Sequence, residues 1–229
     1  MPDLPARLSS IAAKLRTHHR EHGTRATARL VGQRLVRAVY KEEPLLVIVK
    51  DLADVRVPVR RGRVRLEPLE PRHLPALREL NRDRPEDPGA DDRHAADLAA
   101  GYAGFVGFID DEVVACYWWA DATMPEHRDM RLFDLGIELG RRDVYGFDLY
   151  VRRDRRGGGT GGDVLYQVER ALQERGMQQL WGYVLADNAP ARWVYDARGY
   201  EARWGIDRRR ILGRWRNRIV SVEGAERRA

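Results

Sequence analysis

Residues 156–161 read Arg-Gly-Gly-Gly-Thr-Gly, and two very different segments flank them. Residues 143–151, Asp-Val-Tyr-Gly-Phe-Asp-Leu-Tyr-Val, have the branched and aromatic content of a buried strand. Residues 163–175 carry apolar side chains at the spacing of an amphipathic helix. Glycines let backbone N–H groups converge, and a helix N-terminus is partially positive. This strand-loop-helix arrangement therefore predicts a site for the pyrophosphate of a cofactor.

Other glycine-rich loops also bind phosphates, but the sequence disfavours them here. The phosphate loop of nucleotide hydrolases ends in Gly-Lys-Ser/Thr, whereas this loop continues Gly161-Gly-Asp163 without a lysine. The dinucleotide pattern G-x-G-x-x-G fits Gly157, Gly159 and Gly162, and Asp187 offers an acid after the next strand. Only about 65 residues follow, too few for that fold's further βα units at ~30 residues each. A dinucleotide-dependent oxidoreductase stays a minor alternative.

A second block lies about 30 residues beyond the loop. Residues 188–200 read Asn-Ala-Pro-Ala-Arg-Trp-Val-Tyr-Asp-Ala-Arg-Gly-Tyr. With the Arg156-x-x-Gly-x-Gly161 spacing, this block resembles the GNAT superfamily of acyl-CoA-dependent N-acetyltransferases, whose signatures are (Gln/Arg)-x-x-Gly-x-(Gly/Ala) and Asn-x-x-Ala-x-x-x-Tyr-x-x-x-Gly-(Phe/Tyr). Arg153 departs from the proline usual near that position. The resemblance covers roughly residues 63–212.

The resemblance implies an α/β (α+β) fold with a mixed, mostly antiparallel sheet. The sheet is expected to be splayed between its fourth and fifth strands and flanked by helices. We expect three parts: a basic N-terminal extension over 1–62 with two amphipathic helices and a strand, an acetyltransferase domain over 63–222, and a frayed tail over 223–229.

Residue patterns place the other elements. The extension helices fall within residues 4–41, with His22-Gly23 between them. Further strands are expected at 45–49, 64–69, 105–109, 113–120, 135–139, 180–185 and within 203–219, and further helices at 71–81, 91–100 and 188–200. Asp110-Asp111 is expected to form a hairpin turn. Trp118 and Trp119 alternate on a strand, so one is expected in the core and the other beside the acceptor.

For the cofactor, the resemblance implies that backbone of the 143–151 strand pairs with the pantetheine arm while the loop binds the pyrophosphate. The expected acetyl-CoA-binding residues are Leu149, Tyr150, Val151, Arg155, Arg156, Gly157, Gly158, Gly159, Thr160, Gly161, Asn188 and Ala191. Two plainer alternatives stay open. The loop can be a connection without a ligand, and Asn188 can be simply a helix N-cap.

For the chemistry, the resemblance implies transfer of an acetyl group to an amine. Tyr195 is the expected acid for the leaving thiolate, with a core aromatic as its alternative. Asp148 is the expected base for the amine, directly or through water. His127, Asp134 and Glu138 are weaker candidates for the base. Oriented N–H groups of the parted strand are expected to stabilise the oxyanion.

Composition limits the remaining possibilities. The 14 Lys/Arg and 6 Asp/Glu of residues 1–63 leave 27 and 29 for the rest, so the basic character lies in the extension. No nucleic-acid-reading motif and no run of 18 apolar residues is present. The single cysteine, Cys116, is expected to be a buried thiol in a cytoplasmic protein. His18 and His22 share a helix face without a further ligand, so we expect no metal.

The acceptor is expected to be a small-molecule amine. The Tyr40–Leu52 segment resembles bacterial relatives linked to cell-surface polysaccharide or natural-product pathways, which hints at an amino sugar. The basic helices are expected to cover the sheet; a homodimer surface or a face on an anionic membrane are alternatives. A non-catalytic acyl-CoA-binding regulatory or scaffold protein is the main alternative function.

Overall fold

The computed structural model describes residues 40–55, 57, 62–82, 84, 87 and 89–229. The predicted helices of the extension, including His18 and His22, lie outside the described residues apart from their expected end near Lys41. There, residues 40–42 form a strand instead of a helix. These residues and 209–216 form one compact unit, and the other described residues form a second, larger one.

In the part of the chain that the structure describes, nine strands are joined by hydrogen bonding, and they form the mixed, mostly antiparallel sheet that the family resemblance implied. The strands are β1 (Tyr40–Glu42), β2 (Leu45–Asp51), β3 (Arg65–Pro68), β4 (Ala103–Ile109), β5 (Glu112–Asp121), β6 (Asp143–Val151), β7 (Gln179–Leu185), β8 (Glu201–Ile211) and β9 (Arg214–Val220). Their order is β1-β8-β2-β7-β6-β5-β4-β3, with β9 also paired to β8. Neighbours along this order are antiparallel except β6 and β7, which are parallel.

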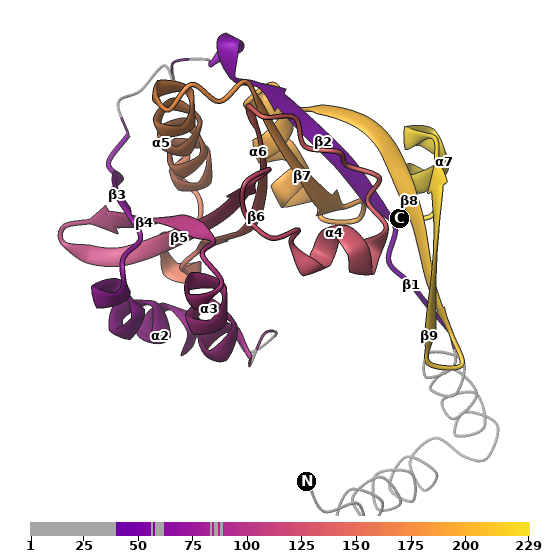
Figure 1. The fold of residues 1–229 in the computed structure, drawn as a ribbon, viewed down its shortest axis with the longest axis horizontal. Helices are drawn as coiled ribbons and strands as arrows, with labels where there is room; N and C mark the ends of the chain where they lie inside the picture. The colour runs from indigo at the N-terminus through magenta and orange to yellow at the C-terminus, as the bar shows by residue number, and fades with distance from the viewer. Residues whose placement is uncertain (1–39, 56, 58–61, 83, 85–86, 88) are drawn as a thin grey trace, which may run out of the picture. The chain divides into compact units, whose positions relative to one another are not determined.

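Helices cover both faces of the larger unit's sheet. The helical segments are η1 (Leu52–Asp54), η2 (Pro71–His73), α2 (Leu74–Arg82), α3 (Ala90–Ala99), α4 (Arg128–Phe133), η3 (Arg153–Arg155), α5 (Thr160–Glu174), α6 (Ala189–Ala197) and α7 (Val222–Glu226). One apolar cluster packs under α5 and α6, and another under α2, α3 and α4. Figure 1 shows α5 on one side of β4 and β5, with α2 and α3 on the other. In the part of the chain that the structure describes, every helix is too short or too polar to span a bilayer.

Local chemistry accounts for the β4–β5 hairpin. Asp110 and Asp111 adopt φ angles of 50° and 63°. A two-residue turn between antiparallel strands needs both residues in the left-handed region, where aspartate is tolerated better than most side chains. The expected acid-pair turn is confirmed, and it aligns β4 with β5, the strand that carries both Trp118 and Trp119.

Three local expectations were wrong. Residues 135–139 form no strand; they follow α4, which the sequence did not reveal. The tail is not simply frayed, because residues 222–226 form α7, capped by the Ser221 hydroxyl, with Ala225 fully buried. Finally, Trp118 and Trp119 are both buried, at 0% and 3% exposure, in the two clusters on opposite faces of the sheet.

The strand assigned to the extension lies inside the sheet. β2 pairs with β7 through its whole length and with β8 on its other side. Six of its seven residues are buried, which matches the continuous apolar run Leu45–Val49. The larger compact unit accordingly begins at Glu43, upstream of the boundary expected after residue 62.

Candidate functional site

The sheet opens between β6 and β7. These parallel strands pair only from Asp143↔Gln179 to Tyr145↔Trp181, and they separate beyond that point. Counted from β3, they are the fourth and fifth strands, so the expected splay is confirmed. Each strand has a glycine immediately after its last pair, Gly146 and Gly182.

A side chain at Gly146 would clash with Tyr117 on the neighbouring strand β5. A Cβ added there would come within 1.8 Å of the Tyr117 hydroxyl oxygen. We expect Gly146→Ala to lower the free energy of unfolding by about 1–3 kcal/mol, the usual range for overpacking. Chemical denaturation measures the effect. Tyr117→Phe in the same background should recover part of the loss, and equal stability of Gly146→Ala and wild type would contradict the close contact.

The open edge of β6 presents backbone groups to the gap. The Arg152 N–H donates to the Val114 carbonyl on β5. Since peptide groups alternate sides along a strand, those of Val151 face away from β5. By the same alternation, the peptide groups of Tyr150, which lies opposite Cys116, face β5. Of the two residues expected to pair with a pantetheine arm, Leu149 and Val151, the second therefore presents its peptide groups to the gap.

A β-bulge interrupts β6 beside the gap. Trp118 stands opposite Phe147 and Cys116 opposite Tyr150, so two β6 residues, Asp148 and Leu149, share one position on β5. Asp148 has φ of 48°, unusual for a residue other than glycine. Bulges re-aim nearby groups, and this one turns the backbone at the point where the strands part.

The glycine loop, residues 156–161, has a left-handed backbone at three consecutive positions. Gly157, Gly158 and Gly159 have φ of 91°, 56° and 90°, and no atom lies within 4 Å of a Cβ added to any of them. Gly159 directly precedes α5, whose first turn carries N–H groups without intrahelical acceptors. Three exposed left-handed glycines at a helix N-terminus leave room for a phosphate against the backbone.

The loop arginines are partly committed elsewhere. The Arg156 Nε donates to the Val151 carbonyl at 2.9 Å, and its guanidinium lies 5.1 Å from the Tyr150 ring centre. Arg155 pairs with Glu112 at 3.0 Å. Both side chains have solvent exposure and can reorient, but neither points at the loop in the structure as it stands.

Tyr195 lies on α6, on the same sheet face as α5. Its ring packs edge-on against Tyr200, 4.9 Å between centroids. Burial raises the pKa of Tyr195 to about 12, so the phenol keeps its proton at neutral pH. Asn188 caps α6 by accepting from the Ala191 N–H at 3.2 Å. The expected helix-cap role of Asn188 is thus observed, and its cofactor contact stays a prediction.

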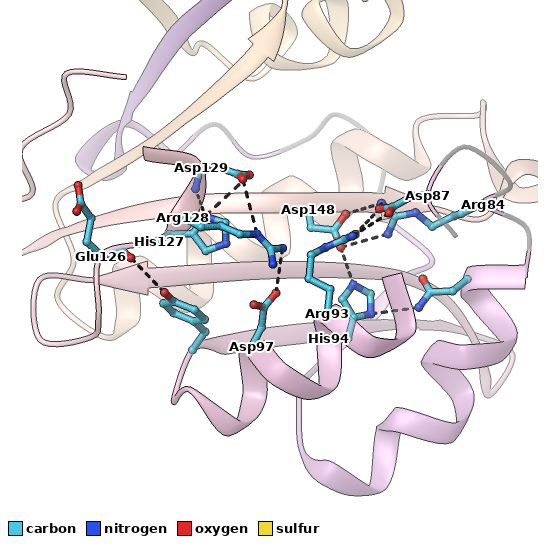
Figure 2. A network of polar contacts seen from close by, with 12 residues as sticks. Arg84, Asp87, Arg93, His94, Asp97, Glu126, His127, Arg128, Asp129 and Asp148 are labelled. Carbon is cyan, nitrogen blue, oxygen red and sulfur yellow. Dashed lines mark hydrogen bonds and ion pairs between the residues drawn. The ribbon is translucent and has the colours of Figure 1, made fainter. Parts of the chain in front are cut away.

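A polar pocket of about 460 Å³ opens where β6 and β7 part, on the face opposite α5 and α6. Its lining residues are Arg84, Asp87, Arg93, His127, Arg128, Asp129, Phe147, Asp148 and Tyr183. Figure 2 shows the surrounding polar network in two groups, one around Asp148 and the other around Arg128 and Asp129.

Asp148 is at the centre of the first group. Arg84 donates to both of its carboxylate oxygens, at 2.6 and 3.2 Å, and the His94 Nε2 lies 2.6 Å from Oδ2. These hydrogen bonds from His94 and Arg84 outweigh burial and hold the pKa of Asp148 well below its usual range. A carboxylate so stabilised is a weak proton acceptor. The geometry therefore does not favour the base role expected of Asp148.

The protonation of His94 follows from its neighbours. The Asn81 Nδ2 lies 2.7 Å from an Asp91 carboxylate oxygen and 3.2 Å from the His94 Nδ1. An amide NH₂ donates to both, so Nδ1 is the acceptor and the His94 proton is on Nε2, where it donates to Asp148. Hydrogen bonds therefore connect the exposed Asp91 through Asn81 and His94 to Asp148, which is typical of a positioning network.

Cys116, His94 and Asp148 offer three potential metal ligands within 4.8 Å of one another. A cation would have to displace Arg84 from Asp148. Burial also raises the pKa of the Cys116 thiol far above its ordinary value, so the sulfur stays protonated. The trio fits a neutral thiol packed against an ion pair, and Cys116 is fully buried, as expected.

The positions of the weaker candidates for the general base do not favour that role. His127 is buried and caps α4, accepting from the Asp129 N–H at 3.3 Å. Burial lowers the pKa of His127 to about 4, so it is neutral at pH 7. Asp134 and Glu138 are exposed and do not line the polar pocket.

Sequence patterns did not reveal Arg84, Arg93, Asp129 or Tyr183. Residues 82–97 are rich in both charges and resemble a solvated helix and loop. Tyr183 lies in a strand whose other aromatic residue packs in the core. The one available signal was the concentration of aspartates and arginines between 84 and 97, which does not by itself separate a pocket from a surface.

Similar proteins agree with this geometry. A family model described as "Acetyltransferase (GNAT) family" matches residues 72–200, more than half of the chain. No curated protein matches the sequence. The fold resembles a glucosamine N-acetyltransferase region of a fungal multi-domain GH3 beta-N-acetylglucosaminidase, with TM-score 0.56 and 18% identity over 79% of this chain and 22% of that one.

Two bacterial structures are similar as well. A GNAT-family acetyltransferase from Colwellia psychrerythraea gives TM-score 0.54 and 11% identity, covering 84% of this chain and 62% of that one. A GCN5-related N-acetyltransferase from Sphaerobacter thermophilus gives 0.52 and 15%, covering 87% and 58%. This chain covers less than two thirds of the length of each of these three proteins. At these identities the structures support the fold, whereas the family match supports membership. The chain therefore belongs to the acetyltransferase (GNAT) family, whose members generally take acetyl-CoA as co-substrate, as the loop and helix motifs predicted.

Proposed function

We propose that the protein transfers the acetyl group of acetyl-CoA to a primary amine of a small molecule, by direct attack in a ternary complex. The observation that carries the proposal is the gap between β6 and β7. The glycine loop and Tyr195 lie on one face of the sheet, and the polar pocket lies on the other. A thioester and an amine approaching from opposite faces would meet at the bulge beside the gap.

In this mechanism the glycine loop and the start of α5 bind the diphosphate of acetyl-CoA through backbone N–H groups. The pantetheine arm pairs with the open edge of β6 at Leu149 and Val151 as an added strand would. Arg155 and Arg156 turn outward to the phosphates. Asn188 and Ala191, at the start of α6, border the cofactor, while Tyr150 acts through its ring, held between Arg84 and Arg156.

The reaction forms a C–N bond and breaks a C–S bond. The amine attacks the thioester carbonyl, and the resulting oxyanion is stabilised by N–H groups at the bulge. Its collapse releases the CoA thiolate, which takes a proton from the Tyr195 hydroxyl. Asp148 serves by fixing the bulge through Arg84 and His94. Holding the backbone in place before the reaction reduces the reorganisation that the transition state requires.

The variant Tyr195→Phe tests whether Tyr195 is the general acid that protonates the CoA thiolate. We expect kcat to fall by about 10-fold, at the low end for general acid catalysis, because a thiolate is a good leaving group even without full protonation. The KM for acetyl-CoA should stay within about twofold, since the ring remains. Steady-state thiol release measures both, and unchanged kcat would assign Tyr195 to packing alone.

The substrate class is tested by thiol release from acetyl-CoA against a panel of amino sugars, amino acids, polyamines and peptides. Amino sugars head the panel because a structural neighbour is a glucosamine N-acetyltransferase region. Release with at least one amine supports the proposal. Tight acetyl-CoA binding without release for any member would favour the alternative, a non-catalytic acyl-CoA-binding protein.

A further inference from the structure

Three aspartates line the polar pocket, and their charges are compensated to different degrees. Asp148 has Arg84 and His94 within 2.6 Å. Asp87 accepts from Arg93 through both carboxylate oxygens and from Arg84 at 3.3 Å. The Asp129 carboxylate has longer contacts: the Tyr183 hydroxyl at 3.4 Å, the Arg128 Nε at 3.8 Å and the His127 Nδ1 at 3.9 Å. Asp129 therefore retains the most capacity to bind another cation.

Asp129 also has the right position for contact with an acceptor. It lies in the first turn of α4, and its partner Tyr183 is on β7 beyond the last pair with β6. The Asp129 side chain is 21% exposed, whereas that of Asp148 is 15% exposed and lies under Arg84. In Figure 2 the Arg128 side chain extends between Asp129 and Asp97.

The surroundings of Asp129 favour proton uptake. The titratable and charged groups that face it are His127 and Arg128 from the α4 segment, Arg93 and Asp97 from α3, Tyr145 from β6, Tyr183 from β7 and Arg208 from β8. Burial raises the pKa of Asp129, opposed in part by Arg128 and the Tyr183 hydrogen bond. Because His127 is neutral at pH 7, it does not cancel the charge. A carboxylate with a raised pKa is a better base.

We propose that Asp129 binds the acceptor as an ammonium ion and removes its first proton, which makes it the general base of the reaction. The step breaks one N–H bond of R–NH₃⁺ and forms the O–H bond of the Asp129 carboxyl. The free amine then attacks the thioester and loses a second proton to water after the attack. The thiolate takes one proton from Tyr195, which is reprotonated from solvent, and Asp129 returns its proton to solvent. In the net reaction one proton ends on the CoA sulfur and one is released to solvent. This inference rests on the proposed function.

Asp129→Asn tests it, using the panel amine that releases free CoA fastest. We expect kcat/KM at pH 7 to fall by about 100-fold, with unchanged affinity for acetyl-CoA. The deficit should shrink as the pH approaches the pKa of the amine itself, because free amine needs no base. Asp134→Asn is the matched control: this exposed residue ends the same helix in the left-handed region, which asparagine tolerates, and it should behave as wild type.

Tyr183→Phe gives a second readout. It removes a donor that stabilises the Asp129 carboxylate, so the pKa of Asp129 rises and the acidic limb of the kcat/KM profile should move to higher pH. The role of Asp129 as general base would be contradicted if the kcat/KM deficit of Asp129→Asn were equal at every pH, or if Tyr183→Phe left the acidic limb of the kcat/KM profile unmoved. Either result would leave the proposed function intact. If wild type acetylated no amine in the panel, both would be overturned.

Discussion

Gly159→Glu is expected to raise the dissociation constant for acetyl-CoA by about 1000-fold, equivalent to ~4 kcal/mol. Gly159 immediately precedes α5, in a left-handed conformation with open space around its Cα. A glutamate there would bring a carboxylate to the position proposed for the diphosphate, and a like charge in a binding site costs several kcal/mol. It would also strain the loop, because its φ of 90° suits glycine. Isothermal titration calorimetry measures the change.

Two control variants separate charge from strain. Gly101→Glu introduces the same side chain at a φ of 89°, also without an atom within 4 Å, in the turn between α3 and β4. It should show a similar fall in Tm and unchanged affinity for acetyl-CoA. Gly159→Ala keeps the strain without the charge and should weaken binding far less than glutamate does. If Gly159→Glu bound as tightly as Gly101→Glu, the diphosphate would have to lie elsewhere.

The elements around the glycine loop could be predicted because their geometry is local. Residues 143–200 contain the strand, the glycine loop, α5, β7 and α6 in unbroken order, and each junction has its own signal. Consecutive glycines allow positive φ, and Asn188 caps a helix that has a proline in its first turn. Local backbone preferences and hydrophobic periodicity were sufficient to place these elements, whereas the gap between β6 and β7 was expected from the family resemblance.

The polar pocket could not be predicted, because its contacts join residues far apart in the chain. Arg84 meets Asp148 across 64 residues, and Tyr183 meets Asp129 across 54. In sequence each is an ordinary charged or aromatic residue. The helix α4 was missed for a local reason. Its six residues are too few for a periodic apolar pattern to be recognised, and histidine is an unusual N-cap residue. The Asp148 prediction chose a residue that lines the pocket, but Arg84 and His94, whose hydrogen bonds lower the pKa of Asp148, could not be identified from the sequence.

Asp148→Asn is expected to lower the free energy of unfolding by about 3–5 kcal/mol, because its removal leaves the buried Arg84 with the longer 3.3 Å contact to Asp87, which is itself paired with Arg93. The Arg84 side chain is only 9% exposed, and it donates two hydrogen bonds to the Asp148 carboxylate. Because pairing lowers the folded-state pKa of Asp148, its stabilisation is fully present above the unfolded value of about 3.9 and is lost as the pH falls through the folded value. Urea unfolding at pH 7 measures the first effect, and extending the series to about pH 2, below the unfolded pKa, measures the onset of the second.

The matched control is Asp154→Asn, which removes a carboxylate from Arg152 at the surface, where the aspartate side chain is 61% exposed. Water replaces the lost partner there, so Tm should stay unchanged. In the pocket, Arg84→Met combined with Asp148→Asn should be much less destabilising than the sum of the single changes, because the double variant leaves neither charge buried alone. Additive losses would mean that the two residues stabilise the fold independently. The bulge of β6 would then owe its conformation to packing, and the positioning role proposed for Asp148 would fail.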